Sequence, residues 1–164
     1  MSCFPLLNIQ PAFDIDLAAL EAEYFKAQRQ YHPDRFVGKP AQEMTEALQK
    51  SMDINQAYEI LKNPLKRAQY LLGLQGIKVG TEADSVKPAN ALLMEIMDLR
   101  EQLAEAKDIK EINGLYEQIR NLHQNSLLSI SNYYANGEWE KMAQETLRLG
   151  YLAKISDEQK SRKL

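Results

Sequence analysis

The chain has 164 residues, of which 45% are apolar and 26% charged, and its formal net charge is -3. This composition is that of an ordinary globular protein, and it lacks the basic surplus typical of proteins that bind nucleic acid. No apolar run approaches the roughly 20 residues that cross a bilayer, and the N-terminus lacks the pattern of a signal peptide. We therefore expect a cytoplasmic protein whose partners are neither nucleic acid nor membrane.

The small number of cysteines and histidines limits the metal chemistry of the chain. A structural zinc site generally needs four Cys or His ligands, and an iron–sulfur cluster is usually held by four Cys. Cys3, His32 and His123 cannot supply either set, and one cysteine cannot form an internal disulfide. We expect no metal site, no cofactor and a reducing environment.

Helical periodicity organises the N-terminal half. A short first helix is expected before Pro11, and Asp16 is a good N-cap for the amphipathic helix that follows. A long helix is expected from about 41 to 61, and a short one over 65–74. Two long helices joined by a short loop should pack antiparallel. The residues predicted to face their core are Phe4, Leu6, Leu7, Ile9, Leu17, Leu20, Tyr24, Ala27, Tyr31, Met44, Ala47, Leu48, Ser51, Ile54, Tyr58 and Leu61.

A glycine-containing, polar stretch separates the two halves, and we predict domains over 1–75 and 88–164 with a linker over 76–87. Three more helices are expected: one from Pro88 to about Ala106, one capped by Asp108 with Glu111, and one from Glu138 whose end frays over 156–164. Their predicted core residues are Leu92, Ile96, Leu99, Leu103, Ile109, Ile112, Tyr116, Ile119, Leu127, Ile130, Trp139, Met142, Ala143, Thr146, Leu149 and Ala153.

No strand-like alternation interrupts these patterns. The sequence therefore predicts an all-α protein, with an N-terminal helical hairpin flanked by short helices and a C-terminal three-helix bundle.

The first helix of the C-terminal half carries apolar residues on two faces. With Leu92 at zero on a helical wheel, the core stripe lies within about 40° of it, whereas Leu93, Met94 and Met97 lie on the other side. An exposed apolar patch rimmed by charge often marks a partner site, although scattered exposed apolar residues on a solvated acidic face are also normal. The acidic residues around this patch are Asp98, Glu101 and Glu105.

The stretch 31–36, YHPDRF, ends the second helix, because proline disfavours a helical conformation at the residue before it. It places His32 and Asp34 on an exposed turn, with Lys26 and Arg29 on the solvent face of the preceding helix. Acid–base catalysis needs a substrate pocket, for which a short turn has little room, so we expect no catalytic residue and no enzyme activity. From residue chemistry alone, the turn is explained as well by a helix stop as by a binding surface. In a helix stop, His32 would cap backbone carbonyls and Asp34 the following segment.

The order of helix, His-Pro-Asp turn and long antiparallel helix resembles the J-domain of DnaJ-type co-chaperones. In that family the turn and the basic residues before it engage a DnaK-type chaperone and stimulate its ATP hydrolysis. The resemblance implies that the chaperone-binding residues here are Lys26, Arg29, His32, Pro33 and Asp34.

Further motifs are similar to one J-domain subfamily, the HscB iron–sulfur co-chaperones. They are QRQYHPD at 28–34, INQAY at 54–58 and RAQYLL at 67–72, with LME at 93–95 and DLRE at 98–101. HscB proteins present an IscU-type cluster scaffold to a specialised HscA-type chaperone. The resemblance implies a scaffold-binding surface of Leu93, Met94, Met97, Asp98, Glu101, Glu105 and Tyr151.

Two details qualify the resemblance. Met97 and Tyr151 stand where relatives commonly carry leucine and phenylalanine, which bears on affinity more than on function. Tyr151 lies about 120° from Trp139 on the last helix, away from its main core stripe, so we expect it to be exposed.

Eukaryotic relatives carry a cysteine-rich zinc module before the J-domain, whereas this chain has only Cys3, so a bacterial cytoplasmic member is expected. We also expect a monomer. Two alternatives stay open: a J-domain co-chaperone for a different client, and a structural helical adaptor whose His-Pro-Asp turn is only a cap.

Overall fold

The computed structural model describes residues 2–80, 83 and 85–162. Its described residues contain α-helices, one short 3-10 helix and no strand, so the all-α prediction is confirmed. By clustering of its contacts the chain divides into two compact units, Met1–Leu71 and Leu72–Leu164. The elements are α1 Cys3–Leu6, α2 Leu17–Tyr31, η1 Pro33–Phe36, α3 Ala41–Lys62, α4 Pro64–Leu74, α5 Asn90–Glu105, α6 Ile109–Ala135 and α7 Trp139–Arg162.

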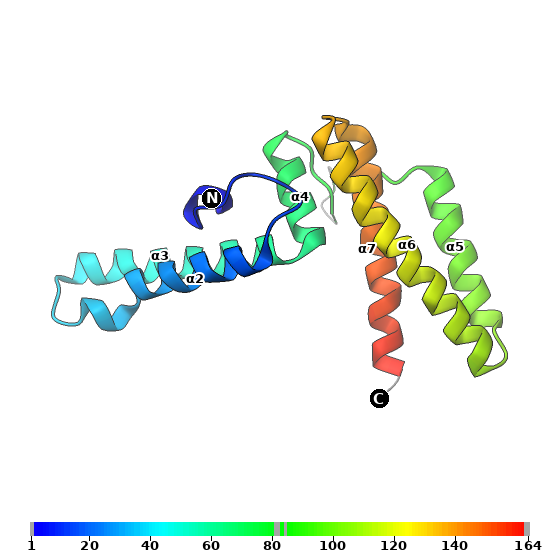
Figure 1. The fold of residues 1–164 in the computed structure, drawn as a ribbon, viewed down its shortest axis with the longest axis horizontal. Coiled ribbons are helices and arrows are strands. Elements are labelled where there is room, and N and C mark those ends of the chain that lie inside the picture. Colours follow the sequence, from blue (N-terminus) through cyan, green and yellow to red (C-terminus); the bar gives the residue numbers. More distant parts are fainter. Residues whose placement is uncertain (1, 81–82, 84, 163–164) are drawn as a thin grey trace. The chain divides into compact units, whose positions relative to one another are not determined.

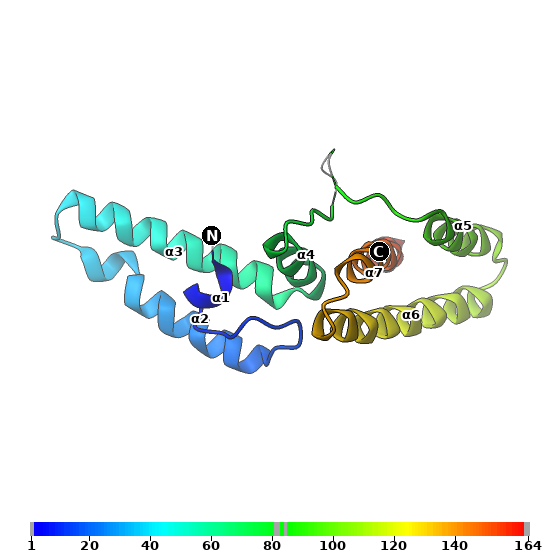
Figure 2. The ribbon, with the colours of Figure 1, turned by 90° about the horizontal axis from the view of Figure 1, so that it is seen from above.

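The N-terminal unit is built on the antiparallel hairpin of α2 and α3, which lie side by side with η1 at the end where they are joined (Figures 1 and 2). The Asp16 carboxylate caps α2, accepting hydrogen bonds from the backbone N–H groups of Ala18 at 2.9 Å and Ala19 at 3.2 Å. α1 packs against α3 and supplies buried Phe4. The core of this unit is completed by Cys3, Leu7, Phe13, Leu20, Ala47, Ile54, Ala57, Leu61, Ala68 and Leu71.

Three predicted core residues of the hairpin are exposed, so those predictions are wrong. Leu17 is the first residue of α2, at the hairpin end where no further turn of its own helix covers it. Met44 and Leu48 lie in the first two turns of α3, whereas α1 packs further along that helix (Figure 2). Ala57, which the predicted stripe omitted, is fully buried. Helical periodicity assigns a side chain to a face but does not say whether a neighbour covers it.

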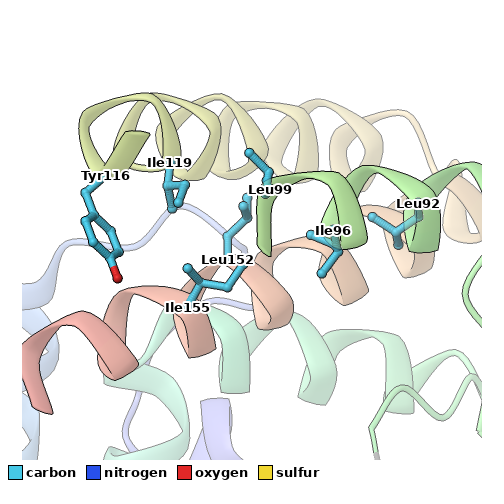
Figure 3. Packing of buried hydrophobic residues seen from close by; sticks show 7 residues of the cluster. All are labelled: Leu92, Ile96, Leu99, Tyr116, Ile119, Leu152 and Ile155. Carbon is cyan, nitrogen blue, oxygen red and sulfur yellow. The ribbon is translucent and has the colours of Figure 1, made fainter. Parts of the chain in front are cut away.

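The C-terminal unit is a bundle of α5, α6 and α7, and side chains of all three helices meet in an apolar cluster. Figure 3 shows its side chains pointing toward one another from all three helices. The predicted stripe of α5 is confirmed, since Leu92, Ile96 and Leu99 are buried there. The rest of the cluster is Tyr116 and Ile119 from α6 with Leu152 and Ile155 from α7, and the last two were absent from the predicted core.

The start of α6 differs in two details from the prediction. Asp108 caps α6 as predicted, accepting from the Glu111 N–H at 2.8 Å, but the Glu111 carboxylate accepts from the N–H of Lys107 rather than from that of Asp108. Ile109, predicted to be buried, is exposed because it is the first residue of α6.

The last helix does not fray at 156, since α7 continues to Arg162. Buried Ile155 and an ion pair between Glu158 and Arg100 of α5 hold this part of the helix against its neighbours. The last two residues of the predicted fraying segment, 163–164, lie outside the described residues.

Candidate functional site

The His-Pro-Asp turn is an exposed corner with a defined local structure. His32 has extended backbone angles, φ -60° and ψ 134°, so it ends α2 and serves as the N-cap of η1. Its ring Nδ1 accepts a hydrogen bond from the Asp34 N–H at 3.2 Å, and its carbonyl accepts one from the Arg35 N–H at 3.0 Å. Pro33 occupies the first position of η1, where its missing N–H costs nothing.

The side chains of His32 and Asp34 stay accessible in the turn. The side chains of His32 and Asp34 are 55% and 89% exposed, with His32 Nδ1 3.5 Å from Asp34 Oδ2. The capping roles predicted for these two side chains are wrong, because the His32 ring caps a backbone N–H rather than carbonyls. Asp34 accepts no backbone hydrogen bond with its carboxylate within the described residues. A side chain that caps with one ring nitrogen still has the other nitrogen for a partner.

The hairpin that carries the turn is braced by a polar network between α2 and α3. Tyr24 donates from its hydroxyl to Asn55 Oδ1 at 2.6 Å, and Gln28 Nε2 donates to the same oxygen at 2.6 Å. The Ser51 hydroxyl donates to Gln28 Oε1 at 3.0 Å, and the rings of Tyr24 and Tyr58 stack with their centroids 4.1 Å apart. These contacts hold the two helices in a fixed register below the turn. Sequence reasoning missed the Gln28–Asn55 pair because amide pairing across helices leaves no periodic signal.

Basic side chains flank the turn on α2, where Lys26 and Arg29 are both exposed, as predicted. Lys26 also lines a groove of about 350 Å³ between α1, α2 and α3, together with Tyr31 and Lys50. The Lys50 Nζ lies 5.8 Å from the centroid of the Tyr31 ring, a cation–π distance. Lys50 was not predicted; it gives this groove a second lysine, and the carboxylate of Glu23 lines the same groove.

The outer face of α5 is the second candidate site. Leu93, Met94 and Met97 are 37%, 64% and 68% exposed, which confirms that they lie opposite the core stripe. The three acidic residues of this helix that were expected around them, Asp98, Glu101 and Glu105, are exposed as well. This face of α5 therefore presents apolar side chains and negative charge to solvent.

Two ion pairs join α5 to α7. Arg148 of α7 reaches Glu95 at 3.1 Å, and Arg100 reaches Glu158 of α7 at 2.9 Å. Gln144 of α7 also holds the segment before α5, accepting from the Ala89 N–H at 2.9 Å and donating to the Lys87 carbonyl at 2.9 Å. The exposed face is thus displayed by a helix anchored along its length.

Tyr151 does not stand free, contrary to the expectation of exposure. It is half-buried and packs against the cluster that includes Leu92, Ile96 and Leu99 of α5. Only part of its ring surface is open to a partner. A sequence wheel places Tyr151 off the main stripe of α7, but α5 packs over that side as well.

A large open depression adjoins the predicted surface at the C-terminal end of α5. It has a volume of about 940 Å³ and includes Glu105, and sequence reasoning did not find it because it joins the end of one helix to the start of the next. The other lining residues are Gln102, Ala106, Lys107, Glu111, Gly114 and Leu115.

Two further observations concern the described part of the chain only. It contains no group of three or more His, Cys, Asp or Glu side chains arranged to hold a metal ion. None of its helices has the length and apolar character that crossing a bilayer requires.

Two family descriptions match the chain, one in each half. Residues 2–70 match the DnaJ domain, and residues 89–160 match the HSCB C-terminal oligomerisation domain. The chain is 35% identical to the co-chaperone protein HscB of Proteus mirabilis, over 96% of this chain and 93% of that protein. It is also 35% identical to the co-chaperone protein HscB homolog of Neisseria meningitidis, over 94% of this chain and 95% of that protein.

Solved structures agree with these sequence matches. The crystal structure of human co-chaperone protein HscB superposes with a TM-score of 0.90 at 27% identity, covering 100% of this chain and 83% of that chain. Chaperone HscB from Vibrio cholerae superposes with a TM-score of 0.86 at 29% identity, covering 99% of this chain and 98% of that chain. With the exposed His-Pro-Asp turn in one half and the three-helix bundle in the other, these matches show that the chain belongs to the HscB family of J-domain co-chaperones.

Proposed function

We propose that the chain stimulates ATP hydrolysis by a DnaK/HscA-type chaperone and delivers an IscU-type iron–sulfur scaffold protein to it. The observation that carries this proposal is the pairing, in one HscB-family chain, of an exposed His-Pro-Asp turn with an apolar, acid-rimmed helix face. The chain itself is a regulator and not an enzyme: the ATP is hydrolysed in the active site of the chaperone.

The turn is the proposed chaperone contact, through Lys26, Arg29, His32, Pro33 and Asp34. A partner can engage His32 and Asp34 because both side chains are more than half exposed, and the polar network between α2 and α3 braces the hairpin that carries them. Exposed Lys26 and Arg29 add attraction for an acidic surface, which strengthens at low salt.

The outer face of α5 is the proposed scaffold contact, through Leu93, Met94, Met97, Asp98, Glu101 and Glu105, with part of Tyr151. Flexible methionine side chains suit an adaptable apolar contact, and the carboxylates favour a partner with basic residues around its own apolar patch. Carrying both contacts on one chain raises the effective concentration of scaffold near the chaperone, so that hydrolysis begins when the client is in place.

The chaperone contact is tested by the steady-state ATPase rate of an HscA-type chaperone with the scaffold present. His32→Gln should abolish the stimulation while the helix content, measured by circular dichroism, stays unchanged. Lys26→Gln and Arg29→Gln should weaken it, more at low salt than at high salt, whereas Lys66→Gln, at an exposed position of α4, serves as the matched charge control. Full stimulation by the His32→Gln variant would leave only the interpretation of the turn as a helix cap.

The scaffold contact is tested by calorimetry with an IscU-type protein. The variant with Leu93, Met94 and Met97 all replaced by Ala should bind at least tenfold more weakly. Leu128→Ala is the matched control, because Leu128 is an equally exposed apolar residue on α6. Undiminished scaffold affinity in the triple variant, with stimulation of the chaperone retained, would indicate a J-domain co-chaperone for a different client.

We further propose functional domains over 1–75 and 88–164 joined by a linker over 76–87, in a monomer of 18.8 kDa from a bacterial cytoplasm. Limited proteolysis of the whole chain should cut first within 76–87. Light scattering should give the mass of one chain. A mass of two chains would contradict the monomer. It would agree with the family that matches residues 89–160, which is described as an oligomerisation domain.

A further inference from the structure

A polar groove runs between α6 and α7 and takes no part in the proposed contacts. Its volume is about 430 Å³. Lys160, one of its lining residues, is nine positions from Tyr151 along α7, which puts the two about 180° apart around the helix. The groove therefore opens on the side of α7 away from the proposed scaffold contact. It is lined by Arg120, His123, Gln124, Ala153, Ser156, Asp157, Gln159 and Lys160.

The groove is lined by one more cationic than anionic side chain, in a chain whose net charge is -3. Arg120 and Lys160 face a single lining carboxylate, that of Asp157, and none of these three groups forms an ion pair with another described residue. By contrast, Arg100 and Arg148 of the same unit are both paired with glutamates. The cations of the groove therefore have charge available for a ligand.

His123 is the most enclosed titratable group of the groove. Its side chain is half-buried, and no side-chain hydrogen bond joins it to another described residue. Burial lowers the pKa of His123 below its ordinary value of 6.5, so the ring is neutral at pH 7. A polar ring half removed from water without a protein partner is a ready donor or acceptor for a bound molecule.

We propose that this groove binds a tetrahedral oxyanion of the phosphate class. The Arg120 guanidinium supplies the planar pair of donors that matches two oxygens of such an anion, and Lys160 adds a second positive charge. His123 and Ser156 supply further donors from the two walls. The volume accommodates a free anion or a phosphate monoester, and it is too small for a folded partner.

The two histidines provide a direct readout, because His123 lies in the groove and His32 lies in the exposed turn of the other unit. Proton NMR across pH 5–8 in sodium sulfate, against sodium chloride at equal ionic strength, follows both imidazoles and gives the pKa of His123. A bound dianion favours the imidazolium form, so sulfate should raise the pKa of His123, and the ring resonances of His123 should move further than those of His32. Equal shifts of the two rings would overturn the proposal. An adventitious ion only, that is, sulfate binding that does not saturate across the titration, would overturn it as well.

Variants locate the binding. The variant with Arg120 and Lys160 both changed to Gln should lose at least tenfold in sulfate affinity, whereas Lys154→Gln removes an exposed charge elsewhere on α7 and should change nothing. Unchanged fluorescence of Trp139 shows that the unit is folded in each variant. Adenosine monophosphate in place of sulfate separates the two sources of the anion: tighter binding assigns a phosphate ester, and weaker or equal binding assigns a free anion. If the double variant keeps its sulfate affinity, the assignment of the anion to this groove is wrong.

Discussion

Ile96 and Met97 are neighbours on α5 with opposite roles, and replacing each with Ala separates stability from binding. Ile96 is 5% exposed within the apolar cluster, whereas Met97 is 68% exposed on the outer face. Ile96→Ala should destabilise the C-terminal unit strongly. Met97→Ala should leave stability almost unchanged and weaken only the proposed scaffold contact.

The size of the first effect follows from burial. Changing Ile96 to Ala removes three methylene-sized groups, worth about 0.8 kcal/mol each when fully buried, so the transfer term is about 2.4 kcal/mol. The cavity left between three helices adds to this, which puts the loss at about 3 kcal/mol, inside the range of about 2–5 for such changes. At 68% exposure, Met97→Ala should stay within about 0.5 kcal/mol.

The chain offers a built-in probe for the measurement, since its single tryptophan, Trp139, begins α7. Urea unfolding followed by Trp139 fluorescence reports the free energy of unfolding of the C-terminal unit. With a slope of about 1.5 kcal/mol per molar, the urea midpoint of the Ile96→Ala variant should fall by about 2 M. Ile96→Val is the milder version, with an expected loss of about 1 kcal/mol. Equal losses for Ile96→Ala and Met97→Ala would refute the assignment of the two faces of α5.

Three other predictions use the same fluorescence signal. Asp108→Ala removes the acceptor of the Glu111 N–H and should lower the free energy of unfolding by about 1 kcal/mol, whereas Asp108→Asn should nearly restore it. A double-mutant cycle of Arg148→Met and Glu95→Gln should give a coupling of at most about 1 kcal/mol, because both partners are about one-third exposed; strictly additive losses would show that the pair does not contribute. Because burial lowers the pKa of His123, the unfolded chain takes up a proton first as the pH falls, so stability should decline below about pH 7 and level off below the folded pKa; a profile that is unaltered in His123→Gln would exclude this origin.

Local chemistry explains which parts of the fold were predictable. Asp16 and Asp108 cap their helices because an aspartate before an apolar-periodic run satisfies backbone N–H groups within three residues. The stripe of Leu92, Ile96 and Leu99 repeats at helical spacing and is buried as expected. These features depend on neighbours in the sequence, so the sequence alone is sufficient to find them.

Features that depend on distant neighbours were missed or mistaken. Ile155 and Glu158 keep α7 helical beyond the expected fraying point, and the partner of Glu158 is Arg100, 58 positions away. Tyr151 shows the same effect within the candidate site, because it is half-buried against a cluster to which α5, α6 and α7 all contribute. The roles of the exposed α5 residues stay a prediction until a partner is tested.

The cap made by His32 fixes the chemical form in which the turn meets a partner. A neutral imidazole carries one N–H and one bare nitrogen, and Nδ1 must be the bare one while it accepts the Asp34 amide hydrogen. The neutral ring therefore offers a single donor, on Nε2. A partner that meets the capped ring must therefore present a hydrogen-bond acceptor to Nε2.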